Sequence, residues 1–120
     1  MEKNDVTAYN PEALPAVVVR YLSTHADRDK RQAMIELFTA DARVVDEGVE
    51  YLGVDAIQRW LSTAASEYNY TTELVGQEHV ASDRWVVLAR LEGDFPGGVA
   101  DLRYRFTTRD ELILDLVIAP

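Results

Sequence analysis

Apolar side chains repeat with a helical period in the first half of the chain and with a period of two in the second half. After Asn10 and Pro11, a residue pair typical of a helix start, Leu14, Val17 and Tyr21 fall on one helical face. The charged segment 27–30 separates this helix from a second one, expected over residues 30–38. The expected buried side of the second helix consists of Ala33, Met34, Leu37 and Phe38.

A third helix is expected to begin at Gly53, and its apolar stripe is the most regular in the chain. That stripe consists of Ile57, Trp60, Leu61, Ala64 and Tyr68. From Tyr70 onward the alternation of apolar and polar residues predicts strands instead. Turn signals divide this half into four strands, which we place at residues 70–79, 84–93, 99–107 and 111–118.

A short hairpin is predicted between the second and third helices. Val44 and Val45 favour a strand, Asp46-Glu47-Gly48 is a turn signal, and a second strand runs from Val49 to Leu52. Asp46 is the residue of interest, because a carboxylate at the end of an apolar strand can face a cavity. The alternative is that Asp46 only begins the turn, where aspartate is favoured for local hydrogen bonds.

Three helices followed by four short-linked strands predict an α+β domain with a curved antiparallel sheet. We expect the helices on the concave face of the sheet, which leaves a cone-shaped pocket suited to a small molecule. Residues 1–9 are expected to be a loose arm, and residues 10–120 a single domain.

The composition excludes several classes of function. Among 120 residues, 21 acidic against 12 basic side chains give a formal net charge of −9, which disfavours nucleic acid and anionic membranes as partners. The chain has no cysteine, two histidines without metal-ligand spacing, and no glycine-rich phosphate loop, so we expect no metal and no cofactor. It also lacks a long apolar segment or signal-peptide core, and a cytoplasmic protein is the simplest expectation.

The order of these elements resembles the nuclear transport factor 2-like superfamily, and most closely its SnoaL-like and ketosteroid-isomerase-like branch. Four segments carry the resemblance: Val19–Tyr21, Phe38–Asp46, Leu52–Ile57 and Asp101–Phe106. The resemblance covers about residues 12–118. It implies a cystatin-like cone fold, a small apolar ligand and a homodimer through the convex sheet face, but the superfamily includes enzymes and non-enzymes alike.

The resemblance also implies roles for individual residues. Asp46 falls where ketosteroid isomerases keep a proton-shuttling carboxylate, and Tyr21 falls where they keep an oxyanion-holding tyrosine. Their second oxyanion donor, a protonated acid, corresponds to Leu102, with Asp101 turned to the opposite strand face. Leu61 stands where they have a supporting tyrosine. The proposed catalytic pair is therefore Asp46 and Tyr21, without the second donor.

Further side chains are candidates for the pocket wall. They are Trp60, Tyr104, Phe38, His25 and Tyr70. Each aromatic residue, Tyr21 included, could equally be plain core, and His25 could contact the carbonyl groups at a helix end. The loop at residues 94–98 could overhang the pocket, although an ordinary hairpin loop explains it as well.

Three functions remain open from the sequence. The first is an isomerase, cyclase or hydratase that uses Asp46 for proton transfer on an apolar carbonyl compound. The second is a protein that binds a small molecule without transforming it. The third is a dimeric interaction module whose pocket is filled by its own side chains.

Overall fold

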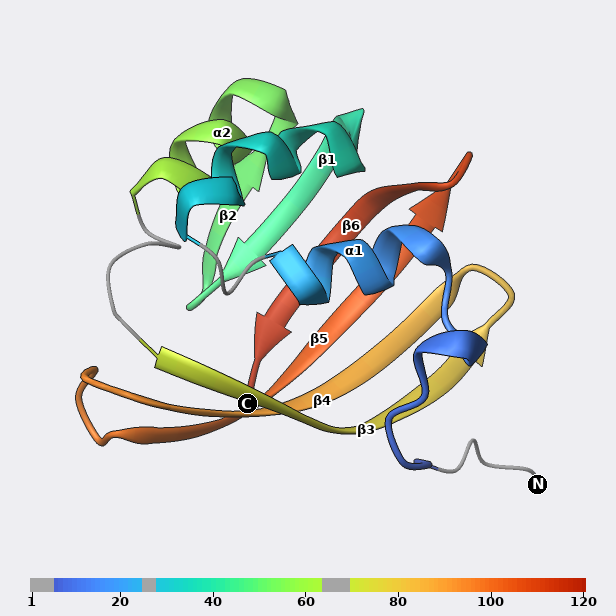
Figure 1. Ribbon diagram of the computed structural model, residues 1–120. Helices are drawn as coiled ribbons and strands as arrows, with labels where there is room; N and C mark the ends of the chain where they lie inside the picture. Colours follow the sequence, from blue (N-terminus) through green and yellow to red (C-terminus); the bar gives the residue numbers. More distant parts are fainter. Residues whose placement is uncertain (1–5, 25–27, 64–69) are drawn as a thin grey trace.

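Six strands form one curved sheet in the order β2-β1-β6-β5-β4-β3 (Figure 1). The computed structural model describes residues 6–24, 28–63 and 70–120. Strands β3 (Tyr70–Ala81), β4 (Arg84–Gly93), β5 (Val99–Arg109) and β6 (Leu112–Ala119) are joined as an antiparallel meander. The alternation of apolar and polar residues after Tyr70 predicted this meander, with boundaries that differ by at most two residues.

The hairpin of β1 (Phe38–Asp46) and β2 (Val49–Leu52) extends the sheet beyond β6. Strand β1 pairs with β6 in parallel, with Val44 opposite Leu116 and Asp46 opposite Ile118. The prediction of a wholly antiparallel sheet is therefore wrong at this junction. A parallel pair requires a long crossover connection, which the chain between the two strands provides.

The first predicted helix is divided by a proline. Asn10 caps a 3-10 turn, η1 (Pro11–Ala13), by accepting a 3.1 Å hydrogen bond from the backbone N–H of Glu12. Leu14 is then extended, since the residue before a proline avoids the helical conformation, and α1 (Ala16–Thr24) begins after Pro15. Figure 1 shows α1 lying across the inner face of the sheet.

The second predicted helix is a 3-10 helix, η2 (Arg28–Leu37), and the third is α2 (Gly53–Ser62). The described residues thus contain two α-helices rather than three. Met34 and Leu37 are buried three residues apart, as the 3-10 repeat requires, whereas Ala33 is exposed, contrary to expectation. Phe38 begins β1 instead of ending the helix, because its backbone pairs with Ile113 of β6.

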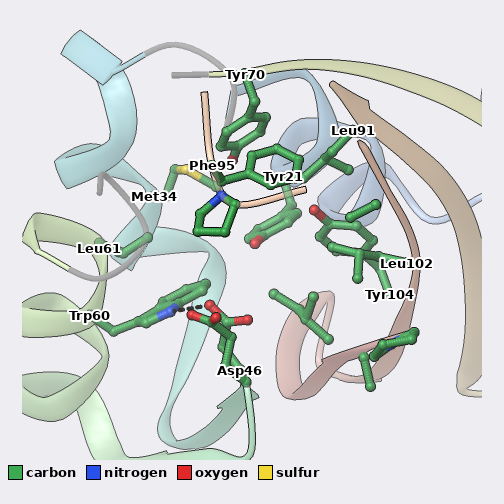
Figure 2. A pocket seen from close by; sticks show the side chains of 16 residues that line it. Tyr21, Met34, Asp46, Trp60, Leu61, Tyr70, Leu91, Phe95, Leu102 and Tyr104 are labelled. Atoms are coloured by element: carbon green, nitrogen blue, oxygen red, sulfur yellow. Dashed lines mark hydrogen bonds between the residues drawn. The ribbon is translucent and has the colours of Figure 1, made fainter. Parts of the chain in front are cut away.

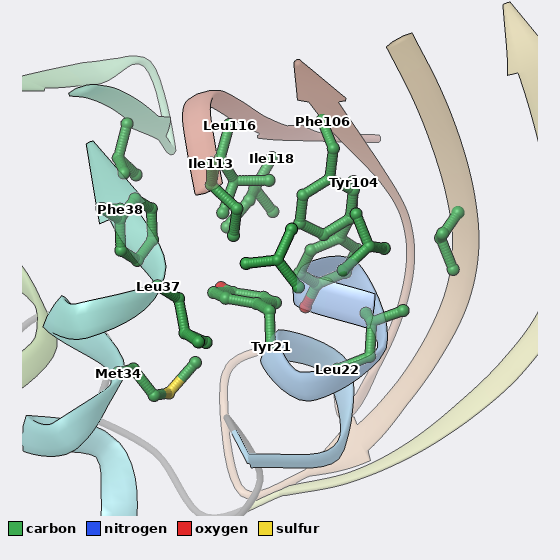
Figure 3. Packing of buried hydrophobic residues seen from close by; sticks show 14 of the residues in the cluster. Tyr21, Leu22, Met34, Leu37, Phe38, Tyr104, Phe106, Ile113, Leu116 and Ile118 are labelled. Atoms are coloured by element: carbon green, nitrogen blue, oxygen red, sulfur yellow. The ribbon is translucent and has the colours of Figure 1, made fainter. Parts of the chain in front are cut away.

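Aromatic rings fill the core between α1 and the sheet (Figure 3). The ring centroid of Tyr21 lies 5.5 Å from that of Phe106, 6.2 Å from that of Tyr104 and 6.3 Å from that of Phe38. The Phe38 and Phe106 contacts are edge-on, an arrangement that aromatic pairs favour. These contacts fix the orientation of the Tyr21 ring.

The segment before η1 lies against the free edge of β3. Thr7 and Gln77 exchange two backbone hydrogen bonds of 2.9 Å, and the side-chain oxygen of Gln77 accepts from the backbone N–H of Asn10 at 2.7 Å. Within the segment predicted as a loose arm, residues 6–9 therefore follow the sheet edge. In the described part of the chain, no helix is long and apolar enough to cross a membrane.

Candidate functional site

A cavity of about 480 Å³ lies between the inner face of the sheet and the helices. Five of the side chains proposed from the sequence line it: Asp46, Tyr21, Trp60, Tyr104 and Tyr70 (Figure 2). They come from β1, α1, α2, β5 and β3, so the fold brings together residues that are far apart in the sequence.

Two of the proposed wall residues are not placed in this cavity. Phe38 is buried in the core, where it packs edge-on against Tyr21, and it is not among the lining residues. Because Phe38 begins β1 rather than ending a helix, its ring packs against the Tyr21 ring in the core. His25 lies outside the described residues.

Asp46 ends β1 immediately before a two-residue turn. Glu47 and Gly48 in this turn have positive φ angles of 53° and 77°, the conformation of the tight hairpin turns that match strand twist. The Asp46 side chain points into the cavity, where its Oδ2 accepts a hydrogen bond of 3.0 Å from Nε1 of Trp60 (Figure 2). The turn alone does not account for this orientation, because the Trp60 donor comes from α2.

Burial raises the pKa of the Asp46 carboxyl above its ordinary value. The hydrogen bonds from the Trp60 indole and from the backbone N–H of Glu47 act in the opposite direction, because they favour the charged form and lower the pKa. Desolvation is the larger effect. A carboxyl with a raised pKa in a cavity wall has the character of a general base or acid.

Trp60 is buried because it lies on the apolar side of the amphipathic helix α2. Ile57, Trp60 and Leu61 form the buried side of this helix, and the Trp60 ring lies 6.2 Å from the ring of Tyr51 on β2. Trp60 is 2% exposed. Its indole N–H therefore reaches Asp46 from a side chain that the core holds rigidly.

Tyr21 faces the cavity from α1. Its side chain is 2% exposed, and Figure 2 shows its hydroxyl directed into the cavity, toward the Asp46 side. A phenol that shares a cavity with a carboxyl group can donate a hydrogen bond to an oxygen of a molecule bound between them. The alternative of a tyrosine serving only the core does not explain its place in the cavity lining.

Leu102 and Leu61 also line the cavity. Leu102 on β5 is half-buried, and its neighbour Asp101 is exposed on the opposite face, as the strand alternation predicts. The cavity therefore has an aliphatic side chain where the resemblance to ketosteroid isomerases implies a second acidic donor.

Further residues line the cavity. Phe95 and Pro96 belong to the β4–β5 loop, for which the sequence left open both an overhang of the pocket and an ordinary hairpin loop, and both residues contribute to the wall. Ile118, Ala119 and Pro120 at the end of the chain also contribute, and these three were not singled out from the sequence. Nothing in the local sequence indicates that the end of β6 reaches the cavity, because this depends on the parallel pairing with β1.

Among the residues that the structure describes, the charged side chains that line the cavity are acidic. The ionisable carboxylates among its lining residues are Asp46 and Glu47, and no lysine or arginine is among them. No group of three or more histidine, aspartate or glutamate side chains that could hold a metal ion occurs in the part of the chain that the structure describes.

Comparisons with known proteins place the chain in a family. No family model and no curated protein matches it. A crystal structure from Sinorhizobium meliloti, provisionally described as a polyketide cyclase, is 35% identical with a TM-score of 0.82, over 92% of this chain and 100% of that one. The protein belongs to the SnoaL-like, ketosteroid-isomerase-like branch of the nuclear transport factor 2-like superfamily.

More distant structures share the fold. A Catenulispora acidiphila protein with a ketosteroid-isomerase-like fold, solved with trimethylamine, is 20% identical with a TM-score of 0.76, over 90% of this chain and 87% of that one. A SnoaL-like cyclase structure from Shewanella putrefaciens, also provisionally described, is 15% identical with a TM-score of 0.65, over 85% of each chain.

Proposed function

We propose that the protein is an enzyme that moves a proton on a small, mostly apolar carbonyl compound, as an isomerase, cyclase or hydratase does. One observation carries this proposal. Asp46 is the only carboxylate among the described residues that is both partly buried and directed into the cavity, and the Tyr21 hydroxyl faces the same space.

In the proposed reaction, Asp46 removes a proton from the carbon next to a carbonyl group. The electron pair of the broken C–H bond forms an enolate, and the Tyr21 hydroxyl donates a hydrogen bond to the enolate oxygen. Asp46 then returns the proton to another carbon, or the enolate carbon attacks a second carbonyl group and closes a ring. In the ring-closing route the π electrons of the attacked carbonyl move to its oxygen, and this oxygen takes the proton from Asp46. Neither route changes the overall oxidation state, so the proposal requires no redox cofactor.

The walls support a substrate of this class. Most of the lining side chains are aliphatic or aromatic, and a cavity of about 480 Å³ lies within the usual range for small-molecule sites, roughly 300–1,000 Å³. We propose that the curved sheet narrows this space to a cone, with Trp60, Tyr70 and Tyr104 contacting the substrate. The description of the Sinorhizobium meliloti relative as a polyketide cyclase supports a substrate with several carbonyl groups.

Binding without transformation is the second candidate, and Leu102 favours it. With Leu102 in the wall, an enolate would have Tyr21 as its one strong donor from the proposed catalytic set. Loss of one donor of this type typically costs ~2.7–4 kcal/mol of transition-state stabilisation. A protein that only retains a carbonyl compound has no need for the second donor.

We also propose that the protein's partner is a second copy of itself, bound through the outer face of the sheet, which is turned away from α1. Val86 and Leu88 alternate with the core residues of β4 and lie on this outer face. Leu52 on β2 lies on the same face and is 62% exposed. Strand β4 is therefore apolar on both faces, and such a strand favours cover on both.

The test measures proton abstraction directly. The protein is incubated in D₂O with apolar ketones, including 2-tetralone and a Δ5-3-ketosteroid, and exchange at the carbon beside the carbonyl is followed by NMR. We expect exchange above the background rate, a loss of about 10²–10⁴-fold in Asp46→Asn, and a smaller loss in Tyr21→Phe.

Asp101→Asn is the matched control. It removes the same charge from the exposed face of β5 and should leave exchange unchanged. Tight binding of a ketone, detected by quenching of tryptophan fluorescence, without any exchange would support the binding protein instead. Exchange that survives in Asp46→Asn would contradict the role of Asp46 as the base.

A further inference from the structure

The hydrogen bond between Trp60 and Asp46 distinguishes the two oxygens of the carboxylate. Nε1 of Trp60 donates to Oδ2 at 3.0 Å, and Oδ1 has no such contact with the indole. A carboxylate oxygen that already accepts a hydrogen bond is a weaker base than one that does not. The indole contact by itself therefore lowers the basicity of Oδ2 relative to Oδ1, and the second donor to the carboxyl group, the backbone N–H of Glu47, comes from the turn rather than from a side chain.

Trp60 is suited to this role because the fold leaves it little freedom. It is on the buried side of α2, is 2% exposed and packs near Tyr51. An indole has a single N–H donor and no acceptor, so it can only favour the ionised carboxylate. A rigid donor also keeps the carboxyl group from rotating away from the cavity.

We infer that Trp60 is a positioning residue that holds Asp46 through Oδ2, so that Oδ1 is the atom that takes up the proton. The inference rests on the proposed function for its catalytic consequence, while the hydrogen bond itself can be tested without any substrate. It assigns to Trp60 a role beyond that of the cavity wall which the sequence indicated.

Other titratable groups share the cavity with Asp46. Apart from Asp46, the titratable groups among the described cavity residues are the carboxylate of Glu47 and the phenols of Tyr21, Tyr70 and Tyr104. Glu47 follows Asp46 directly and its side chain is exposed, and Tyr21, Tyr70 and Tyr104 belong to α1, β3 and β5. No cationic side chain among the described lining residues pairs with Asp46. Two hydrogen bonds favour the ionised form of Asp46, one from the Trp60 indole and one from the backbone N–H of Glu47, and only the indole can be removed by substituting a side chain.

The first experiment uses the wild-type protein. The chain has two tryptophans, so a ¹H–¹⁵N spectrum shows two indole signals, from Trp60 and Trp85. We expect the Trp60 signal to shift with pH as Asp46 ionises, and this shift to disappear in Asp46→Asn. The Trp85 ring stacks on His79 at 3.7 Å and is not among the cavity residues, so its signal should not follow the ionisation of Asp46. A Trp60 signal that ignores the ionisation of Asp46 would overturn the inference.

The second experiment replaces the donor. Trp60→Phe keeps an aromatic ring but removes the N–H, so the pKa of Asp46, measured by ¹³C NMR of its carboxyl group, should be higher than in the wild type. Trp85→Phe is the matched control, because Nε1 of Trp85 is buried without a hydrogen-bond partner among the described residues and lies outside the cavity. This control should leave the pKa of Asp46 unchanged.

The exchange assay then distinguishes a role of Trp60 in positioning Asp46 from a purely structural role. In Trp60→Phe the acidic limb of the pH–rate profile should move to higher pH, and the plateau rate should fall about tenfold, the equivalent of one charge-assisted hydrogen bond. If the wild type shows no exchange, the proposed reaction fails while the NMR titrations still decide the role of Trp60. If Trp60→Phe is destabilised, the wild-type titration decides alone. An unchanged carboxyl pKa in folded Trp60→Phe would overturn the inference.

Discussion

Arg43 on β1 and Asp115 on β6 form an ion pair across the parallel junction of the sheet. Nε of Arg43 lies 2.7 Å from Oδ1 of Asp115, and Nη2 lies 3.3 Å from Oδ2, which is the two-pronged geometry that guanidinium and carboxylate groups favour. Arg43 and Asp115 are opposite each other in the same register that places Asp46 opposite Ile118. The sheet register and the position of Asp46 are therefore linked.

We expect Arg43→Gln to lower the free energy of unfolding by about 1 kcal/mol, near the upper limit for exposed pairs. The side chains of Arg43 and Asp115 are 41% and 25% exposed, so solvent screens the interaction and a larger effect is not expected. Urea unfolding measures the change, and a double-mutant cycle with Asp115→Asn isolates the coupling. The control is Arg90→Gln, whose Nε is 3.8 Å from Glu92 and which should cost less. A coupling of zero would mean that the strand pairing alone sets the register.

The ionisation of Asp46 makes stability depend on pH. Burial raises the pKa of Asp46 in the folded state, so the folded protein retains this proton to higher pH than the unfolded chain does. The free energy of unfolding must then fall as the pH rises from the unfolded pKa of about 3.9 through the folded value, and level off above it.

Asp46→Asn should remove this pH-dependent fall in the free energy of unfolding, because asparagine stays neutral. Its side-chain oxygen can still accept the hydrogen bond from Trp60. We expect the variant to gain stability relative to the wild type as the pH rises from about 4 to about 8. Urea unfolding across this range measures the difference, in which the titration of the other acids largely cancels. A difference that stays constant with pH would show that the Asp46 pKa is not raised by folding.

Local patterns predicted most of the fold. The meander after Tyr70 depends on neighbouring strands joined by short turns, and each turn is encoded by a few adjacent residues. The parallel pairing of β1 with β6 was not predictable in this way. It joins residues such as Arg43 and Asp115, which lie 72 positions apart, and no local signal marks either partner.

The same difference between local patterns and long-range pairings explains which cavity residues could be predicted from the sequence. Asp46, Tyr21 and Trp60 were proposed because each has a position in a local pattern or in the family resemblance. Phe38 was misplaced because its helical spacing competes with a strand pairing to distant Ile113. Ile118 enters the wall through the same distant pairing, so only the assembled sheet reveals its position.

The proposed dimer predicts one species in solution and a specific way to disrupt it. We expect the wild type to sediment at twice 13.5 kDa at micromolar concentration. Leu88→Glu places a charge on the outer face and should yield monomers, with circular dichroism confirming that the fold persists. Ser82→Glu, at the exposed β3–β4 turn, adds the same charge and should remain dimeric. Sedimentation of the wild type as a monomer would refute the proposal.

Leu102 allows the catalytic proposal to be tested by adding a function rather than by removing one. Because the wall has leucine where the resemblance implies a second enolate donor, we expect the wild type to isomerise a Δ5-3-ketosteroid poorly or not at all. Leu102→Asn would present an amide N–H from the same position on β5. If the enolate forms between Asp46 and Tyr21, this donor should recover part of the ~2.7–4 kcal/mol that an oxyanion donor contributes, and the isomerisation rate should increase.

Appearance of the conjugated enone by ultraviolet absorbance measures this rate. Ala100→Asn is the matched control, since Ala100 lies two residues earlier on β5 and also lines the cavity, but not at the position of the missing donor. An equal rate increase in both variants would indicate a general effect of cavity polarity. Efficient isomerisation by the wild type would mean that a second donor is unnecessary, because Tyr21 or another group already stabilises the enolate sufficiently. The rate in the double variant Leu102→Asn with Asp46→Asn should return to background, since a better oxyanion site cannot act without a base.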